Sequence, residues 1–185
     1  MISQGISHTA YDVMREYMIT GAELDGKYQI PMMERYTDRP GEDTVDFKDS
    51  FSPKIKNHRK LTVNFYIHDC EFERIWNNPD RYLEHLKCFH SVIAPDFSMA
   101  VGQGGMPFAM NIWQKYRNHA LSYYLSMNGI KVIPNVNIPP EYCYDWAFDG
   151  VPKRSTVACY TNGRIKARAS REEFCKGFKE MEKRI

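Results

Sequence analysis

Polar side chains that could do chemistry follow three short apolar segments of the sequence. Asp69 ends the segment LTVNFYIHD, and Asp96 and Ser98 follow the segment HSVIAP. Asn135 and Asn137 come after the segment IKVIP. Two carboxylates in one site can divide the roles of general acid and general base, or can bind a divalent cation such as Mg²⁺. We therefore take Asp69 and Asp96 as a candidate catalytic pair, with Mg²⁺ as a candidate cofactor.

Each of these carboxylates also has an ordinary structural interpretation. Asp96 follows Pro95, and its side chain can accept backbone N–H groups in an Asx-turn. Asp69 precedes a helical segment, and its side chain can cap that helix. Both interpretations stay open beside the catalytic one.

Three residues outside the strand-like segments also belong to the candidate site. Tyr116 and Arg117 lie in a long helical segment, and Arg117 is one residue away from its apolar face. Arg117 is expected either to pair with a strand-end carboxylate or to bind a phosphate, and a solvated surface arginine is the alternative. Asp149 precedes Gly150, where a turn role competes with a functional one. The candidate substrate-binding residues are Ser98, Tyr116, Arg117, Asn135, Asn137 and Asp149.

The elements that must position these residues alternate between strands and helices. Short apolar runs predict strands at 61–69, 90–96, 130–138 and 156–161. Helical spacing predicts helices at 70–89, broken near 77–79, at 107–129 and at 170–185. This order indicates an α/β fold with a mostly parallel sheet of about four to five strands and covering helices, either partly β/α-barrel-like or doubly wound. Its strand ends would bring the polar groups to one rim.

The N-terminal part of the chain has a different texture. Residues 9–19 have helical spacing, and residues 20–60 are polar and interrupted by glycine and proline. We expect an N-terminal helix and irregular arm over residues 1–60 and an α/β domain over residues 61–185. Residues 1–50 have 5 basic against 10 acidic side chains, whereas residues 151–185 have 10 against 4. This asymmetry permits contact with a charged partner.

Composition excludes several classes of protein. The 185 residues are 43% hydrophobic and 14% aromatic, which is typical of a globular domain. No run of about 18 apolar residues predicts a transmembrane helix, and no secretory signal is visible, so we expect a cytoplasmic protein without membrane contact. The five cysteines form no C-x-x-C pair, which argues against a zinc ribbon.

Three stretches resemble a known family. They are FYIHDCEFERIWNNPDRYLEHLKCFHSVIAPDFSM, MPFAMNIWQKYRNHALSYYLSMNGIKVIPNVNI and FDGVPKRSTVACYTNG. Together they are similar to the phage and mobile-element proteins grouped as domain of unknown function 4417, over residues 61 to about 180. The resemblance implies a protein of a phage, prophage or plasmid, which would act in the cytoplasm of the bacterial host cell, and it implies no reaction. Its motif residues here are Trp76, Pro79, Asp96, Ser98, Tyr116, Arg117, Pro134 and Asp149.

Two functions from different classes fit these observations. The first is an enzyme that acts on nucleic acid or a nucleotide at the polar rim, helped by the basic segments 54–60 and 164–168. The alternative is a non-catalytic inhibitor that binds a host protein, such as a defence complex in the manner of an anti-CRISPR protein, through the acidic arm. A homodimer is a third, structural option.

Overall fold

The computed structural model describes residues 14–161 and 165–185 of the chain. Part of the helix predicted over residues 9–19 therefore lies outside the described residues, as does Arg164 of the second basic segment. The described part of the predicted N-terminal helix contains a 3₁₀ turn, η1 (Glu16–Ile19).

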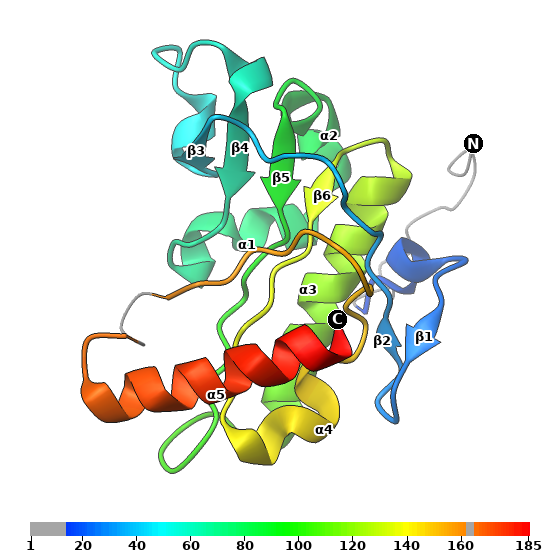
Figure 1. The fold of residues 1–185 in the computed structure, drawn as a ribbon. Helices are drawn as coiled ribbons and strands as arrows, with labels where there is room; N and C mark the ends of the chain where they lie inside the picture. Colours follow the sequence, from blue (N-terminus) through cyan, green and yellow to red (C-terminus); the bar gives the residue numbers. More distant parts are fainter. Residues whose placement is uncertain (1–13, 162–164) are drawn as a thin grey trace.

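Four parallel strands form the central sheet, in the spatial order β3-β4-β5-β6 (Figure 1). The strands are β3 (Asp43–Asp46), β4 (Leu61–Asn64), β5 (Ser91–Ile93) and β6 (Val132–Ile133). A separate antiparallel pair is formed by β1 (Leu24–Asp25) and β2 (Ile30–Pro31). The predicted α/β class with a mostly parallel sheet is confirmed.

The helices follow the strands as the periodicity predicts. They are α1 (Asp69–Asn77), α2 (Asp80–Leu86), α3 (Phe108–Met127), α4 (Tyr144–Ala147) and α5 (Arg168–Arg184). Short 3₁₀ turns are η2 (Asp49–Phe51), η3 (His58–Lys60) and η4 (Glu141–Cys143). Helix α3 begins after Pro107, which lacks the N–H that a first turn leaves unpaired, and ends before Gly129, whose φ of 84° suits a left-handed terminator.

The hydrophobic core is formed by residues of the central strands and of the helices that follow them in the chain. Val63 of β4 and Val92 of β5 are fully buried and belong to one apolar cluster with Phe72 of α1 and Leu121 of α3. Strands with apolar residues on both faces are what a parallel sheet requires, because crossover helices cover it. This explains why the strands read as short continuous apolar runs.

Two segments differ from the predictions. Residues 156–161 were predicted as a strand, and within the described residues they form a single bridge, Asn135↔Ala158. The prediction was wrong because the N–H of Thr156 bonds to the carbonyl oxygen of Tyr36 at 2.7 Å and does not extend a ladder. Conversely, β3 lies inside the stretch predicted as irregular. It was missed because Val45 is its one buried residue, as suits a polar edge strand.

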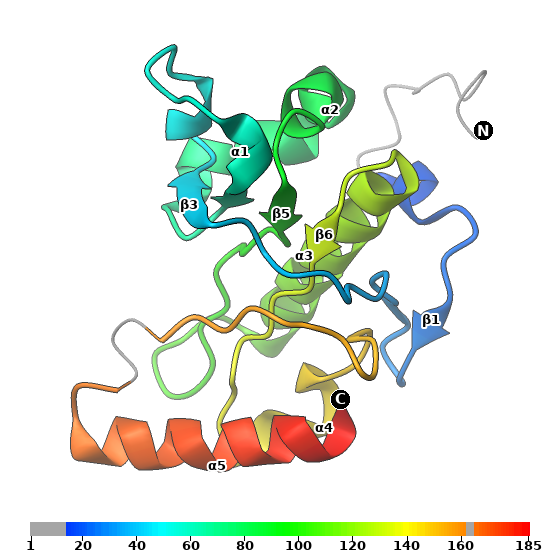
Figure 2. The ribbon, with the colours of Figure 1, turned by 45° about the horizontal axis from the view of Figure 1, so that its top comes forward.

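The carboxyl ends of the strands face the part of the molecule that contains α4, α5 and the first turns of α3. Figure 1 shows the arrowheads of the sheet directed toward this end, and Figure 2 shows α5 lying across it. The basic segment 54–60 precedes β4 and lies at the opposite, amino end of the sheet. None of the helices within residues 14–161 and 165–185 combines the length and the apolar character that crossing a membrane requires.

Candidate active site

The carboxylate of Asp96 lies where the ends of three neighbouring strands meet. Its Oδ1 accepts hydrogen bonds from the side-chain amides of Asn135 and Asn137, both at 2.9 Å. The hydroxyl of Tyr66, which follows β4, donates to Oδ1 of Asn135 at 2.9 Å. The segments after β4, β5 and β6 therefore supply one connected polar cluster, to which the segment after β4 contributes Tyr66 and not the predicted Asp69. The partners of Asp96 are side-chain amides of a neighbouring strand end, not the backbone N–H groups of an Asx-turn.

The environment of Asp96 favours its protonated form. Burial raises the pKa of its carboxyl, the two asparagine amides oppose this rise, and the nearby charge of Asp69 adds to it. A carboxyl with a raised pKa is the kind of group that exchanges protons in catalysis. The same burial, together with the charge of Asp96, raises the pKa of the Tyr66 hydroxyl.

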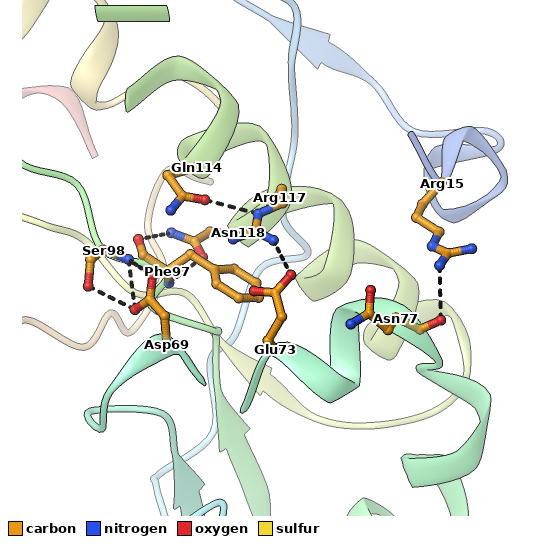
Figure 3. A network of polar contacts seen from close by, with 9 residues as sticks. All are labelled: Arg15, Asp69, Glu73, Asn77, Phe97, Ser98, Gln114, Arg117 and Asn118. Atoms are coloured by element: carbon orange, nitrogen blue, oxygen red, sulfur yellow. Dashed lines mark hydrogen bonds and ion pairs between the residues drawn. The ribbon is translucent and has the colours of Figure 1, made fainter. Parts of the chain in front are cut away.

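Asp69 anchors the loop after β5. Its Oδ1 accepts the hydroxyl of Ser98 at 2.8 Å, and the backbone N–H of Ser98 lies 3.1 and 3.2 Å from the two carboxylate oxygens. Figure 3 shows this contact between α1 and the loop. Asp69 is the first residue of α1, after the cap residue His68, and does not cap that helix with its side chain. The structure thus pairs two predicted site residues, Asp69 and Ser98, beside Asp96.

Arg117 points to a different partner from the one expected. It is 8% exposed, and its Nη1 forms an ion pair with Oε1 of Glu73 on α1 at 2.7 Å. Its Nε donates to Gln114, and its guanidinium lies 3.7 Å from the ring centroid of Phe97. Through these contacts, drawn in Figure 3, the guanidinium connects α3 to α1. Its carboxylate partner is Glu73 on a helix, not a carboxylate at a strand end.

The two remaining predicted site residues, Tyr116 and Asp149, make other contacts. Tyr116 stacks on Trp113 with ring centroids 5.5 Å apart. Asp149 lies near Lys115, and among the described residues its buried Oδ2 has no hydrogen-bond partner. Burial raises the pKa of Asp149, and the charge of Lys115 opposes that rise.

A pocket of about 60 Å³ lies next to the Asp96 cluster, between α3, α4 and the segment after β6. Asn135 and Asn137 line it, and so do two residues outside the predicted set, Lys115 and His119. Its remaining lining residues are Met99, Val101, Asn118, Val136, Ile138, Pro139, Pro140, Trp146 and Ala147. The i, i+4 spacing of Lys115 and His119 on one helix was the available sequence signal, since it places both on one face.

Lys115 is held in this pocket wall by two acceptors. It is 3% exposed, its Nζ donates to the carbonyl oxygen of Ala147 at 2.9 Å, and Nε2 of His119 lies 3.2 Å away. Nδ1 of His119 lies 3.0 Å from the carbonyl oxygen of Pro31, which can only accept, so the ring proton is on Nδ1 and Nε2 accepts from Lys115.

Burial dominates the ionisation of this pair. It lowers the pKa of Lys115 to about 7, although the carboxylates of Asp149 and Asp25 oppose the shift. Burial and the charge of Lys115 hold the pKa of His119 well below its usual value. Near neutral pH, Lys115 is therefore able to exist as a free amine.

The carboxylate cluster does not have the arrangement of a Mg²⁺ site. Among the described residues, no group of three or more histidine, cysteine, aspartate or glutamate side chains is placed to hold a metal ion. The Nδ2 groups of Asn135 and Asn137 face Asp96 as donors, and Ser98 occupies the oxygens of Asp69. A hard cation needs oxygen ligands in those positions, so the residues as placed do not fit it.

Known proteins are similar to this chain over most of its length. The family described as domain of unknown function (DUF4417) matches residues 22–185. The "Gene 1 protein" of Mycobacterium phage L5 is 33% identical over 119 residues, which are 64% of this chain and 51% of that protein. The "Gene 1 protein" of Mycobacterium phage D29 is 30% identical over 119 residues, 64% of this chain and 43% of that protein.

The chain spans about half the length of the curated relatives it matches. No solved structure matches it. The resemblance seen in the sequence motifs is confirmed, because the family match extends from residue 22 through the sheet, the Asp96 cluster and the pocket to residue 185. The chain belongs to the DUF4417 family, a family of unknown function with relatives in mycobacteriophages.

Proposed function

We propose that the chain is a phage or mobile-element enzyme that acts on a nucleoside or nucleotide at the carboxyl ends of β4, β5 and β6. One observation carries the proposal: the carboxylate of Asp96 is held by two asparagine amides at the junction of three strand ends. Sites of parallel α/β folds form at this end of the sheet. The phage context follows the names of the relatives.

Asp96 would act as the general acid or base. The raised pKa of its carboxyl lets the side chain hold a proton at a higher pH than an exposed aspartate. Asn135 and Asn137 fix its Oδ1, so its Oδ2 is the oxygen that would meet the substrate. Asp69 would act on Asp96 through its charge and by holding the adjacent loop through Ser98.

Two stacked aromatic rings support a base-containing substrate. The rings of Tyr66 and Tyr160 stack with centroids 4.8 Å apart and an interplanar angle of 27°, and Tyr160 is 36% exposed. The Tyr66 hydroxyl connects this pair to Asn135 and hence to Asp96. An aromatic surface next to amide and carboxylate groups is the chemistry that binds nucleobases.

The distribution of basic residues favours a nucleotide over a long nucleic acid. The segment 54–60 lies at the amino end of the sheet, opposite the proposed site. Arg117, the candidate phosphate ligand, is paired with Glu73. A polymer bound along segment 54–60 would have to pass around the sheet to reach Asp96, whereas a mononucleotide needs the carboxyl end alone.

The test is a calorimetric titration of nucleosides and nucleotides, with and without Mg²⁺, combined with product analysis by chromatography. We expect binding by the wild type and at least about a tenfold loss of turnover in Asp96→Asn, because the amide cannot exchange the proton. Asp38→Asn is the matched control, since Asp38 forms an exposed ion pair with Lys131 before β6. A wild-type protein that binds none of these ligands would remove the proposal.

The alternative function is a non-catalytic inhibitor of a host protein such as a defence complex. Its support is the acidic charge of the first 50 residues, of which Asp43 and Asp49 are exposed on β3 and η2. A pull-down from bacterial lysate with Asp43→Asn/Asp49→Asn beside Asp96→Asn separates the two functions. Stoichiometric capture of a partner that is lost with Asp43→Asn/Asp49→Asn and kept with Asp96→Asn would favour the inhibitor. A homodimer is tested separately, by light scattering.

A further inference from the structure

We propose that Lys115 is a nucleophile that forms an imine with a short hydroxyaldehyde bound in the pocket between α3, α4 and the segment after β6. This goes beyond the proposed function, because acid–base chemistry at Asp96 does not require an amine. The inference starts from the position of Lys115: a lysine that is 3% exposed lines the pocket, between the carbonyl oxygen of Ala147 and Nε2 of His119.

The hydrogen bonds of Lys115 prepare the amine for attack. The carbonyl oxygen of Ala147 and Nε2 of His119 are both acceptors, because the proton of His119 is on Nδ1 toward Pro31. A neutral amine has two hydrogens, and these two acceptors use both of them. The lone pair is then left for a carbonyl carbon.

The charges around Lys115 support a neutral amine. The groups that face it are His119 on its own helix, Asp25 of β1 and Asp149 after α4, and burial outweighs the two carboxylates. With a pKa lowered to about 7, Lys115 has a far larger neutral fraction at pH 7 than an exposed lysine, of which about one in 3,000 is neutral. Imine-forming lysines are activated by desolvation of this kind.

The pocket selects a small, uncharged, hydroxyl-bearing carbonyl compound. Its volume of about 60 Å³ suits a molecule of a few heavy atoms, since one water needs about 10–15 Å³. The amides of Asn135 and Asn137 are groups that hydrogen-bond hydroxyls, and Val136 and Trp146 supply apolar walls. Because the charged groups that face Lys115 include the carboxylates of Asp25 and Asp149, an anionic keto acid is disfavoured.

The reaction is a condensation. The lone pair of Nζ forms a bond to the carbonyl carbon, and the electrons of the C=O double bond move to oxygen. His119 Nε2, 3.2 Å from Nζ, is placed to accept a proton from the nitrogen and return it to that oxygen. The oxygen then leaves as water with both amine hydrogens, and a C=N bond remains. The step needs no oxidant or metal.

The test is reductive trapping on the full chain. The protein is incubated with D-glyceraldehyde and sodium cyanoborohydride at pH 7, digested, and analysed by peptide mass spectrometry. We expect the Lys115 peptide to be modified at least about tenfold faster than the peptides of the exposed Lys131 and Lys176. The ratio should fall as the pH is raised toward 10, because the exposed lysines then become neutral. Equal rates at pH 7 would overturn the inference.

Variants and a second probe sharpen the result. Lys115→Arg keeps a hydrogen-bond donor but cannot form the imine, so trapping at this position should be lost, and circular dichroism checks its folding. Lys131→Arg is the matched surface control, and it should leave labelling of Lys115 unchanged. Faster trapping of pyruvate than of glyceraldehyde at Lys115 would overturn the assigned substrate class.

The outcome is separable from that of the proposed function. Selective trapping at Lys115 without nucleotide binding leaves this inference standing and removes only the role of Asp96. Nucleotide turnover without selective trapping at Lys115 would keep the proposed function and overturn this inference.

Discussion

At the scale of single residues, the candidate site depends on two ionisable side chains whose charged forms are disfavoured. Asp96 and Lys115 lie on different elements, and burial shifts the pKa of each toward the neutral form. Each shift also reduces folding stability over a range of pH, because the unfolded chain ionises more readily than the folded one. This gives stability measurements that need no substrate.

We predict that Asp96→Asn becomes more stable relative to the wild type as the pH rises. The pKa of Asp96 in the folded chain is above the usual value of 3.8. Between the pKa of the unfolded chain and that of the folded chain, the folded wild type therefore binds more protons, and its stability falls as the pH rises through this range. The asparagine variant keeps the two amide contacts and does not titrate. Urea denaturation from pH 3 to pH 7 measures this difference, and parallel curves for the two proteins would contradict it.

Lys115→Met should show the opposite dependence. The pKa of Lys115 is about 7 in the folded chain and 10.5 for an ordinary lysine, so wild-type stability falls as the pH decreases from about 10.5 to about 7. The methionine variant lacks this loss. Its free energy of unfolding relative to that of the wild type should therefore rise by a few kcal/mol as the pH decreases from about 10.5 to about 7. Denaturation at pH 7 and pH 10 tests this. Lys131→Met, at an exposed site, should show no such change.

At the scale of elements, the site is shaped by how helices approach the segments after the strands. Gly177 of α5 lies against the segment after β6, where an added Cβ would be 2.6 Å from Cγ2 of Ile138 and 2.9 Å from the carbonyl oxygen of Pro139. A glycine inside a helix normally lowers stability by about 1 kcal/mol relative to alanine. Here the close backbone contact reverses that expectation.

Gly177→Ala should therefore destabilise the protein, by about 1–3 kcal/mol, instead of stabilising it. The affected contact adjoins Ile138, which lines the pocket, so trapping at Lys115 should also slow. The control is Lys176→Ala on the exposed face of the same helix, which should change stability by less than about 0.5 kcal/mol. A gain in melting temperature for Gly177→Ala would show that α5 does not pack as described.

At the scale of the whole molecule, the N-terminal stretch is fastened to the body on two sides. The N–H of Met33 bonds to the carbonyl oxygen of Gly150 at 2.9 Å, and Asp25 accepts the N–H of Gly150 at 2.8 Å. On the other side, β3 pairs with β4. Figure 3 adds the bond from Arg15 to the carbonyl oxygen of Asn77 on α1. The division at residue 60 into an arm and a domain stays a prediction.

These contacts predict slow hydrogen exchange in the N-terminal stretch. The backbone amides of Met32 and Met33, and those amides of β3 that face β4, should be protected to within about tenfold of those in α3, because they are bonded inside the fold. Exchange measured by mass spectrometry on peptides covering residues 28–47 gives the comparison. Complete exchange of these peptides within seconds, with α3 still protected, would show an arm that detaches.

The local pattern of the sequence was sufficient for much of the fold. The strands β4, β5 and β6, the break between α1 and α2, and both ends of α3 follow from apolar spacing and from residues such as Pro107 and Gly129. These signals act within a few residues of each other, and so they can be recognised in one sequence. The convergence of Asp96 with Asn135 and Asn137 followed from the parallel order of the strands.

Only the tertiary structure decided which polar groups are buried and with what partner. Lys115 and Arg117 are two residues apart on α3, yet one loses its usual pKa in a pocket and the other pairs with Glu73 on α1. The edge strand β3 likewise depends on a neighbour that lies beyond it in the sequence. Burial and pairing are set by segments distant in the chain, because desolvation and hydrogen bonding depend on every surface packed against a group, and local spacing does not contain that information.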